Sequence, residues 1–235
     1  MVQKRISRSR KRDLNNPDEF VTFWAKVFES IAKHKVQVAC ISGFFVVSII
    51  VAAVTVYSLK KSEDRAFALL QQGITKYQTL LKTGDSNKAY LDAGKDFERI
   101  AEKYSGRNGG KLASLIYANM CYSAKDYDKA IVIYKKLLTD FNDESFLKNL
   151  ILNGLGYSYS AKKDYRNSVE YFERIATAPD FSLKDEALFN LGGLYAAIGD
   201  NDKSINAFEK ILSDHSGSMY TEIVKEKVAG HPNRY

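Results

Sequence analysis

The chain has 235 residues, of which 45% are hydrophobic, and it carries a net charge of +7. A chain of this size can bury a substantial core. Two cysteines, Cys40 and Cys121, are too few for the disulfide framework of a small secreted protein. The three histidines are isolated and no zinc-ligand or phosphate-loop spacing occurs, so we expect no metal, no cofactor and no enzymatic activity.

Residues 1–35 form a basic segment with nine Lys or Arg against four Asp or Glu. The opening run KRISRSRKR admits two interpretations, a nucleic-acid contact or a topology signal beside anionic lipid. No aromatic residue interleaves the run, and a long apolar span follows it. This arrangement favours the topology signal, and we expect no nucleic-acid partner.

Within this segment, residues 17–33 predict an amphipathic helix. Asn16 suits an N-cap, and Pro17 suits the first helical position. An apolar stripe rich in aromatic residues then recurs at steps of three and four. We expect the helix to lie in a membrane interface, with docking onto a partner helix as the alternative. The stripe consists of Phe20, Phe23, Trp24, Val27, Phe28 and Ile31.

Residues 36–59 contain no charged side chain and predict a single transmembrane helix. At 1.5 Å of rise per residue, about 20 residues cross the roughly 30 Å hydrocarbon core of a bilayer. The excess of Lys and Arg before the span predicts a cytoplasmic N-terminus, with the larger C-terminal part across the membrane. Lys60, Lys61 and Arg65 on the other side reduce this charge difference.

Residues 60–235 predict helices throughout, because apolar positions recur at helical spacing and no alternating strand pattern persists. Three stretches align with one another, at 122–138, 159–176 and 195–212. Each has an acid heading its second helix, a small residue where helices approach, an aromatic residue and an aliphatic residue. These columns are Asp126, Asp164 and Asp200; Ala130, Ser168 and Ser204; Tyr134, Phe172 and Phe208; and Leu137, Ile175 and Ile211.

These columns and the pairs Leu155-Gly156 and Leu191-Gly192 resemble the tetratricopeptide repeat, although steps of 36 to 38 exceed its period of 34. The resemblance implies a helical repeat solenoid. With the interfacial helix and the single transmembrane helix predicted ahead of it, the expected fold is all-α. A weaker first unit would begin with a helix at about 62–82, and a short helix at about 219–228 would close the array. Residues 182–185 suggest a capping box.

The resemblance also implies a binding groove lined by the first helix of each repeat. Asparagine amides there could hydrogen-bond an extended backbone, and the rings offer rigid apolar area; the alternative is that these residues only pack the repeats together. Carried onto this chain, the groove positions are Leu115, Asn119, Tyr122, Asn153, Tyr157, Phe189 and Gly193.

The whole arrangement of a basic tail (1–35), an anchor (36–59) and a repeat domain (60–235) is similar to the YfgM-type ancillary subunits of the bacterial Sec translocon. This resemblance implies an inner-membrane protein whose periplasmic repeats assist exported polypeptides or periplasmic chaperones at the translocon. The alternative is a scaffold for a cell-envelope assembly or division complex. Both functions require protein or peptide partners and a lipid bilayer.

Overall fold

The computed structural model describes residues 19–82, 84, 86–141 and 144–230. Every described element is an α-helix, and the described residues contain no strand, which confirms the all-α prediction. The chain divides into two units, Met1–Lys60 and Lys61–Tyr235, and each is described by itself. Asn16 and Pro17, the predicted start of the first helix, lie outside the described residues.

The first unit contains α2, Glu19–Lys33, and the beginning of α3, Lys35–Leu81. By length and composition alone, α3 is the one described helix that could cross a membrane. The predicted span and the predicted first repeat helix are thus parts of a single helix. Leu59, Lys60, Lys61 and Ser62 include no Gly or Pro, so the charges that end the apolar run do not end the helix.

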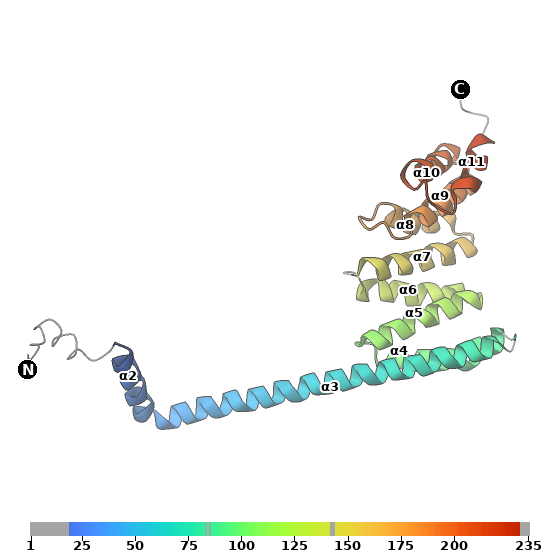
Figure 1. Ribbon diagram of the computed structural model, residues 1–235. Helices are drawn as coiled ribbons and strands as arrows, with labels where there is room; N and C mark the ends of the chain where they lie inside the picture. Colours follow the sequence, from blue (N-terminus) through green and yellow to red (C-terminus); the bar gives the residue numbers. More distant parts are fainter. Residues whose placement is uncertain (1–18, 83, 85, 142–143, 231–235) are drawn as a thin grey trace, which may run out of the picture. The chain divides into compact units, whose positions relative to one another are not determined.

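The second unit is an array of antiparallel helix pairs in which each helix packs against the next one along the chain (Figure 1). The pairs after α3 continue with α4 (Ser86–Lys103), α5 (Asn108–Ser123), α6 (Tyr127–Asp140), α7 (Ser145–Ala161), α8 (Tyr165–Ala176), α9 (Lys184–Ala197) and α10 (Asn201–Asp214). A short helix, α11 (Thr221–Ala229), follows them and buries Val224 and Val228.

The second helices α6, α8 and α10 begin with the same N-cap. The carboxylates of Asp126, Asp164 and Asp200 accept a hydrogen bond from the backbone N–H three residues later. The residues just before two of these caps, Lys125 and Lys163, have positive φ values of 64° and 62°, and the third turn uses Gly199 at 85°. The repeated acid therefore marks a repeated turn geometry, as the sequence columns predicted.

The small-residue column lies where the two helices of a repeat cross. Ser168 Oγ donates to the backbone oxygen of Gly156 at 2.8 Å, and Ser204 Oγ donates to that of Gly192 at 2.6 Å. Both serines are fully buried. The aromatic and aliphatic columns are buried as well, so all three predicted columns contribute to the core. The buried members of these two columns are Tyr134, Phe172, Phe208, Leu137, Ile175 and Ile211.

Consecutive repeats are joined by a second set of hydrogen bonds, which we call the inter-repeat ties. Lys111 Nζ donates to the backbone oxygen of Asp140 at 3.1 Å, and Asn149 Nδ2 donates to that of Ser182 at 3.3 Å. The corresponding residue of the next repeat, Asp185, accepts from Ser218 Oγ at 2.6 Å. Earlier in the chain, the Glu63 carboxylate accepts from the backbone N–H groups of Asn108 and Gly109 at 3.2 and 2.9 Å.

The predicted capping box at 182–185 is wrong. The N-cap of α9 is Leu183, which has a φ of 63° and makes no side-chain cap. Ser182 instead donates from both its backbone N–H and its hydroxyl to Asp180, which lowers the pKa of that carboxyl. Asp185 is occupied by the tie to Ser218. The left-handed residue and the tie together replace the expected cap.

The helix crossing leads to a stability prediction for Gly156→Ala. A Cβ at Gly156 would lie 2.6 Å from the ring of the fully buried Phe172, so the variant should lose about 1–3 kcal/mol of unfolding free energy. Gly193→Ala is the matched control, because nothing lies within 4 Å of its added Cβ. Urea unfolding of the detergent-solubilised chain, followed by far-UV circular dichroism, measures both. Equal stabilities would contradict the prediction.

Candidate functional site

A pocket of about 200 Å³ lies where α5, α6 and α7 meet. It brings together five of the seven predicted groove residues, which come from two successive repeats. Tyr122 and Tyr157 face one another across the repeat boundary with ring centroids 6.5 Å apart. The pocket thus combines aromatic surface with amide groups. Its lining consists of Leu115, Asn119, Tyr122, Tyr134, Leu150, Asn153, Gly154 and Tyr157.

Asn119 is an exposed amide held in a fixed orientation. The Tyr134 hydroxyl, from α6, donates a hydrogen bond to Asn119 Oδ1. This bond occupies the amide oxygen and leaves the amide nitrogen as a donor at the pocket. Burial raises the pKa of Tyr134, which keeps its hydroxyl protonated and able to donate. Asn119 is therefore suited to donate to a carbonyl oxygen of a bound chain.

The far wall of the pocket is fixed by a polar network between α7 and α9. The Glu186 carboxylate accepts from Asn153 Nδ2 at 3.1 Å and from the Tyr157 hydroxyl at 2.7 Å. Asn190 Nδ2 in turn donates to the Tyr157 hydroxyl oxygen at 3.0 Å. The remaining acceptor, Asn153 Oδ1, is buried and has no partner among the described residues. Leaving a buried acceptor without a hydrogen bond lowers stability by about 1–3 kcal/mol. Asn153 Oδ1 is therefore an exception in a network whose other polar groups are paired.

The other two predicted groove residues do not line this pocket. Phe189 stacks on Tyr220 with centroids 4.5 Å apart and also lies 6.1 Å from the Phe208 ring. It is therefore partly covered by the segment that leads into α11. Gly193 borders a separate hollow of about 460 Å³ between α9, α10 and α11. The structure thus divides the predicted groove into a pocket at α5–α7 and a hollow near α11.

Sequence reasoning missed five residues of this site. Tyr134, Leu150 and Gly154 line the pocket, and Glu186 and Asn190 hold its far wall. Asn153 and Glu186 are 33 residues apart, as are Tyr157 and Asn190. Each partner thus lies one helical turn earlier in the following repeat. Pairing each groove position with that neighbour would have identified Glu186 and Asn190.

The stripe of α2 is largely exposed in the structure. Phe23, Trp24, Phe28 and Ile31 are exposed, whereas Val27 is half-buried. Trp24 lies 5.8 Å from the Phe23 ring and 6.2 Å from the Phe28 ring, so the aromatic side chains form one continuous patch. The side chain of Phe20 lies outside the described part. Interfacial binding by this patch remains a prediction.

The described residues contain no group of three or more His, Cys, Asp or Glu that could hold a metal ion. Cys121 is a free, buried thiol whose pKa is raised by burial. The residues that line the pocket offer hydrogen bonding and apolar contact.

Comparison with known sequences decides the family. The profile of the tetratricopeptide repeat-like domain matches residues 38–230. The chain belongs to this family. Tetratricopeptide repeat-like domains generally act as protein-binding scaffolds without catalytic activity. The repeat-solenoid prediction is confirmed.

Two relatives share part of the tetratricopeptide repeat-like region. The intraflagellar transport protein 88 homolog of Homo sapiens is 27% identical over 131 residues, which cover 54% of this chain and 15% of that protein. The uncharacterized protein ycf37 of Cyanophora paradoxa is 28% identical over 112 residues, covering 47% of this chain and 60% of that protein. The chain therefore spans less than two thirds of either relative.

Among solved structures, the fold is similar to a crystal structure of nearly identical TPR-like repeats from Podosopora anserina. The alignment has a TM-score of 0.52 and 13% sequence identity, and it covers 73% of this chain and 81% of that chain. At this identity the likeness shows the fold alone.

The network predicts a stability change at alkaline pH. Burial, and then the hydrogen bond to Glu186, raise the pKa of Tyr157 above its ordinary value of 10.0. Its contribution to stability is therefore complete below pH 10 and is lost as the pH rises through the higher folded-state pKa. Tyr157→Phe should flatten the fall in unfolding free energy above pH 10, measured by urea unfolding at a series of pH values. Parallel curves for both chains would contradict this role.

Proposed function

We propose that this tetratricopeptide repeat-like protein is a membrane-tethered module that binds extended polypeptide segments at the α5–α7 pocket. The observation that carries the proposal is the pairing of Asn119, an oriented donor, with two tyrosine rings from adjacent repeats. An extended chain presents a free carbonyl and N–H at each residue, together with side chains for the rings. The pocket matches both features.

The membrane part of the proposal rests on the uncharged run at 36–59 within α3 and on the basic tail at 1–35. In this arrangement the N-terminus is cytoplasmic and the repeat domain, 60–235, is periplasmic at a bacterial inner membrane. The same plan occurs in YfgM-type subunits, which supports a role beside the Sec translocon with exported chains or periplasmic chaperones as partners. Tethering raises the effective concentration of a weak site near partners in the same membrane.

One observation favours a second function, a scaffold for folded partners in an envelope assembly or division complex. Glu186, Asn153, Tyr157 and Asn190 bond to one another across the repeat boundary. Groups that are satisfied internally stiffen the array and leave fewer contacts for a ligand. The two functions differ in whether an unfolded chain binds.

Asn119→Asp tests the pocket sharply, because it keeps an oxygen for Tyr134 and removes the amide donors. The full chain in detergent micelles should bind a fluorescent unfolded polypeptide about 2- to 10-fold more weakly after this change, the effect of one lost hydrogen bond. Fluorescence anisotropy measures the affinity. Asn206→Asp is the control, since it adds the same charge at an exposed position of α10. Equal affinities for the two variants would contradict polypeptide binding at the α5–α7 pocket. Absence of any binding by the unchanged chain would favour the scaffold function.

Topology is tested in a bacterial host. Protease added outside spheroplasts should digest residues 62–235 while an epitope tag at the N-terminus survives, because the basic tail stays in the cytoplasm. Immunoblotting for tags at both ends reports the result, with a cytoplasmic protein as the control for intact cells. Protection of the repeat domain would exclude the periplasmic location.

A further inference from the structure

One edge of the repeat domain holds the inter-repeat ties, and we call it the proximal edge. It comprises residues 61–67 of α3 together with 104–108, 144–146, 177–183 and 215–220. The ties connect these segments in sequence, from Glu63 to Asn108, from Lys111 to Asp140, from Asn149 to Ser182 and from Asp185 to Ser218. The segments therefore form one continuous surface, although they come from four successive connections.

The proximal edge exposes a row of large apolar side chains. Phe146, Phe181 and Met219 are 56%, 80% and 85% exposed, and each lies at the beginning of α7 or in the loop before α9 or α11. None of them contributes to the core or to the α5–α7 pocket. Three such side chains near the beginnings of α7, α9 and α11 indicate a surface that contacts something apolar.

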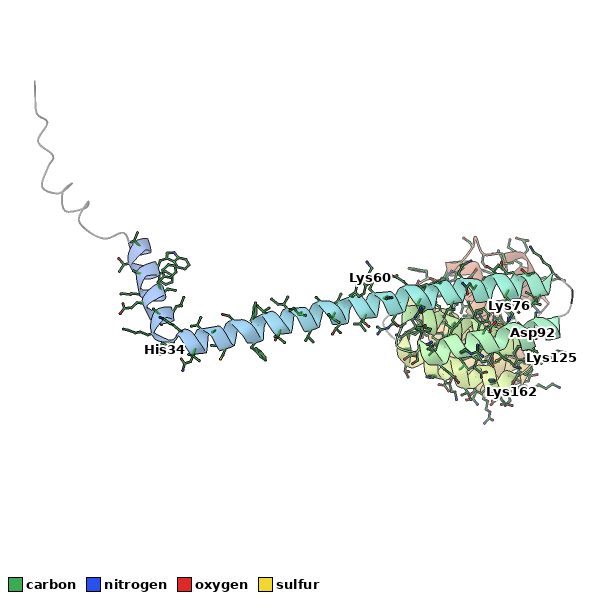
Figure 2. The ribbon with its side chains drawn as sticks, turned by 90° about the horizontal axis from the view of Figure 1, so that it is seen from below. His34, Lys60, Lys76, Asp92, Lys125 and Lys162 are labelled. Atoms are coloured by element: carbon green, nitrogen blue, oxygen red, sulfur yellow. The ribbon has the colours of Figure 1, made fainter. Side chains whose placement is uncertain are left out.

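The opposite edge differs in character. Its turns carry charged residues. The apolar side chains of Ile198 and Leu81 there are 44% and 39% exposed, and Leu91, beside Asp92, is the one that reaches 60%. Figure 2 shows Lys125 and Lys162 at the same end of the domain as Lys76 and Asp92. Lys76 is 13 residues beyond Glu63 on α3, about 20 Å along the helix, so the two edges are well separated. The charged residues of these turns are Lys125, Asp126, Lys162, Lys163, Asp164 and Asp200.

The position of Glu63 on α3 indicates what covers the proximal edge. The apolar run ends at Leu59, and Glu63 follows four residues later in the same helix, about 6 Å along its axis. The headgroup layer on each side of a bilayer is about 5–8 Å thick. If residues 36–59 cross the membrane, as the proposed function requires, the ties begin within this layer.

The chemistry of the proximal edge suits the surface of a bilayer whose lipids carry no net charge. Lys184 Nζ lies 5.1 Å from the centre of the Phe181 ring, so an ammonium and an aromatic ring are available together at headgroup depth. Acids are also present, but Asp180 bonds to Ser182 and Asp185 bonds to Ser218. With both signs of charge on the edge, apolar contact is the main attraction.

We propose that the proximal edge rests on the bilayer crossed by α3 and inserts Phe146, Phe181 and Met219 at the boundary between headgroups and acyl chains. The repeat domain is then held to the membrane by these side chains as well as by its covalent tether. This contact is separate from peptide binding, since the α5–α7 pocket shares none of the three side chains.

The test places a tryptophan on each edge of the full chain in phosphatidylcholine vesicles. Trp24, the single native tryptophan, is first replaced by Trp24→Phe. Phe181→Trp and Met219→Trp are then compared with Lys162→Trp, the control on the opposite edge. Phosphatidylcholine brominated along its acyl chains quenches only tryptophans at the membrane. Emission from the two proximal variants should be blue-shifted and strongly quenched, whereas the control should be unaffected.

Three results would overturn the inference, and they differ in what they imply for the anchor. Unquenched emission at both proximal positions, in chains that resist alkaline extraction from the vesicles, would exclude the lipid contact and leave a protein as the partner of this edge. Complete alkaline extraction would show that α3 is not integrated, so the anchor and the inference would fail together. Quenching of the control to the same extent would also exclude a contact specific to the proximal edge.

Discussion

The repeat domain depends on the close approach of the two helices within each repeat. At the crossings, Ser168 and Ser204 donate to the backbone oxygens of Gly156 and Gly192, and the rings of Phe172 and Phe208 lie against those glycines. A larger residue at the crossing would separate the helices, and the apolar columns on both would lose their packing.

Features that repeat the same chemistry could be predicted from the sequence. The capping aspartates and the buried columns recur as similar residues, so their positions and roles were visible. The inter-repeat ties were not visible, because one structural position is filled by Lys111, Asn149 and Asp185, which share no chemical type. The continuity of α3 was missed for another reason: Lys60 and Lys61 end the hydrophobic run but favour a helix.

The candidate site was predictable to the extent that it lies on one helix per repeat. The groove positions carried over from the tetratricopeptide repeat identified five residues of α5 and α7 that share the pocket. It could not show that Glu186 would occupy Asn153 and Tyr157, since hydrogen bonds across repeats depend on how the helices stack. The stacking of Tyr220 on Phe189, which removes Phe189 from the pocket, could not be predicted, because Tyr220 belongs to no repeat column.

The inter-repeat ties also bear on the order in which the domain folds. Each tie joins a repeat only to its neighbour, and the paired residues from Lys111 onward lie 29 to 33 positions apart. Such an array needs no contact between distant parts of the chain, so loop-closure entropy stays small and structure can propagate from one repeat to the next. A chain that emerges gradually from a narrow channel can thus add each new repeat to the one that has already emerged.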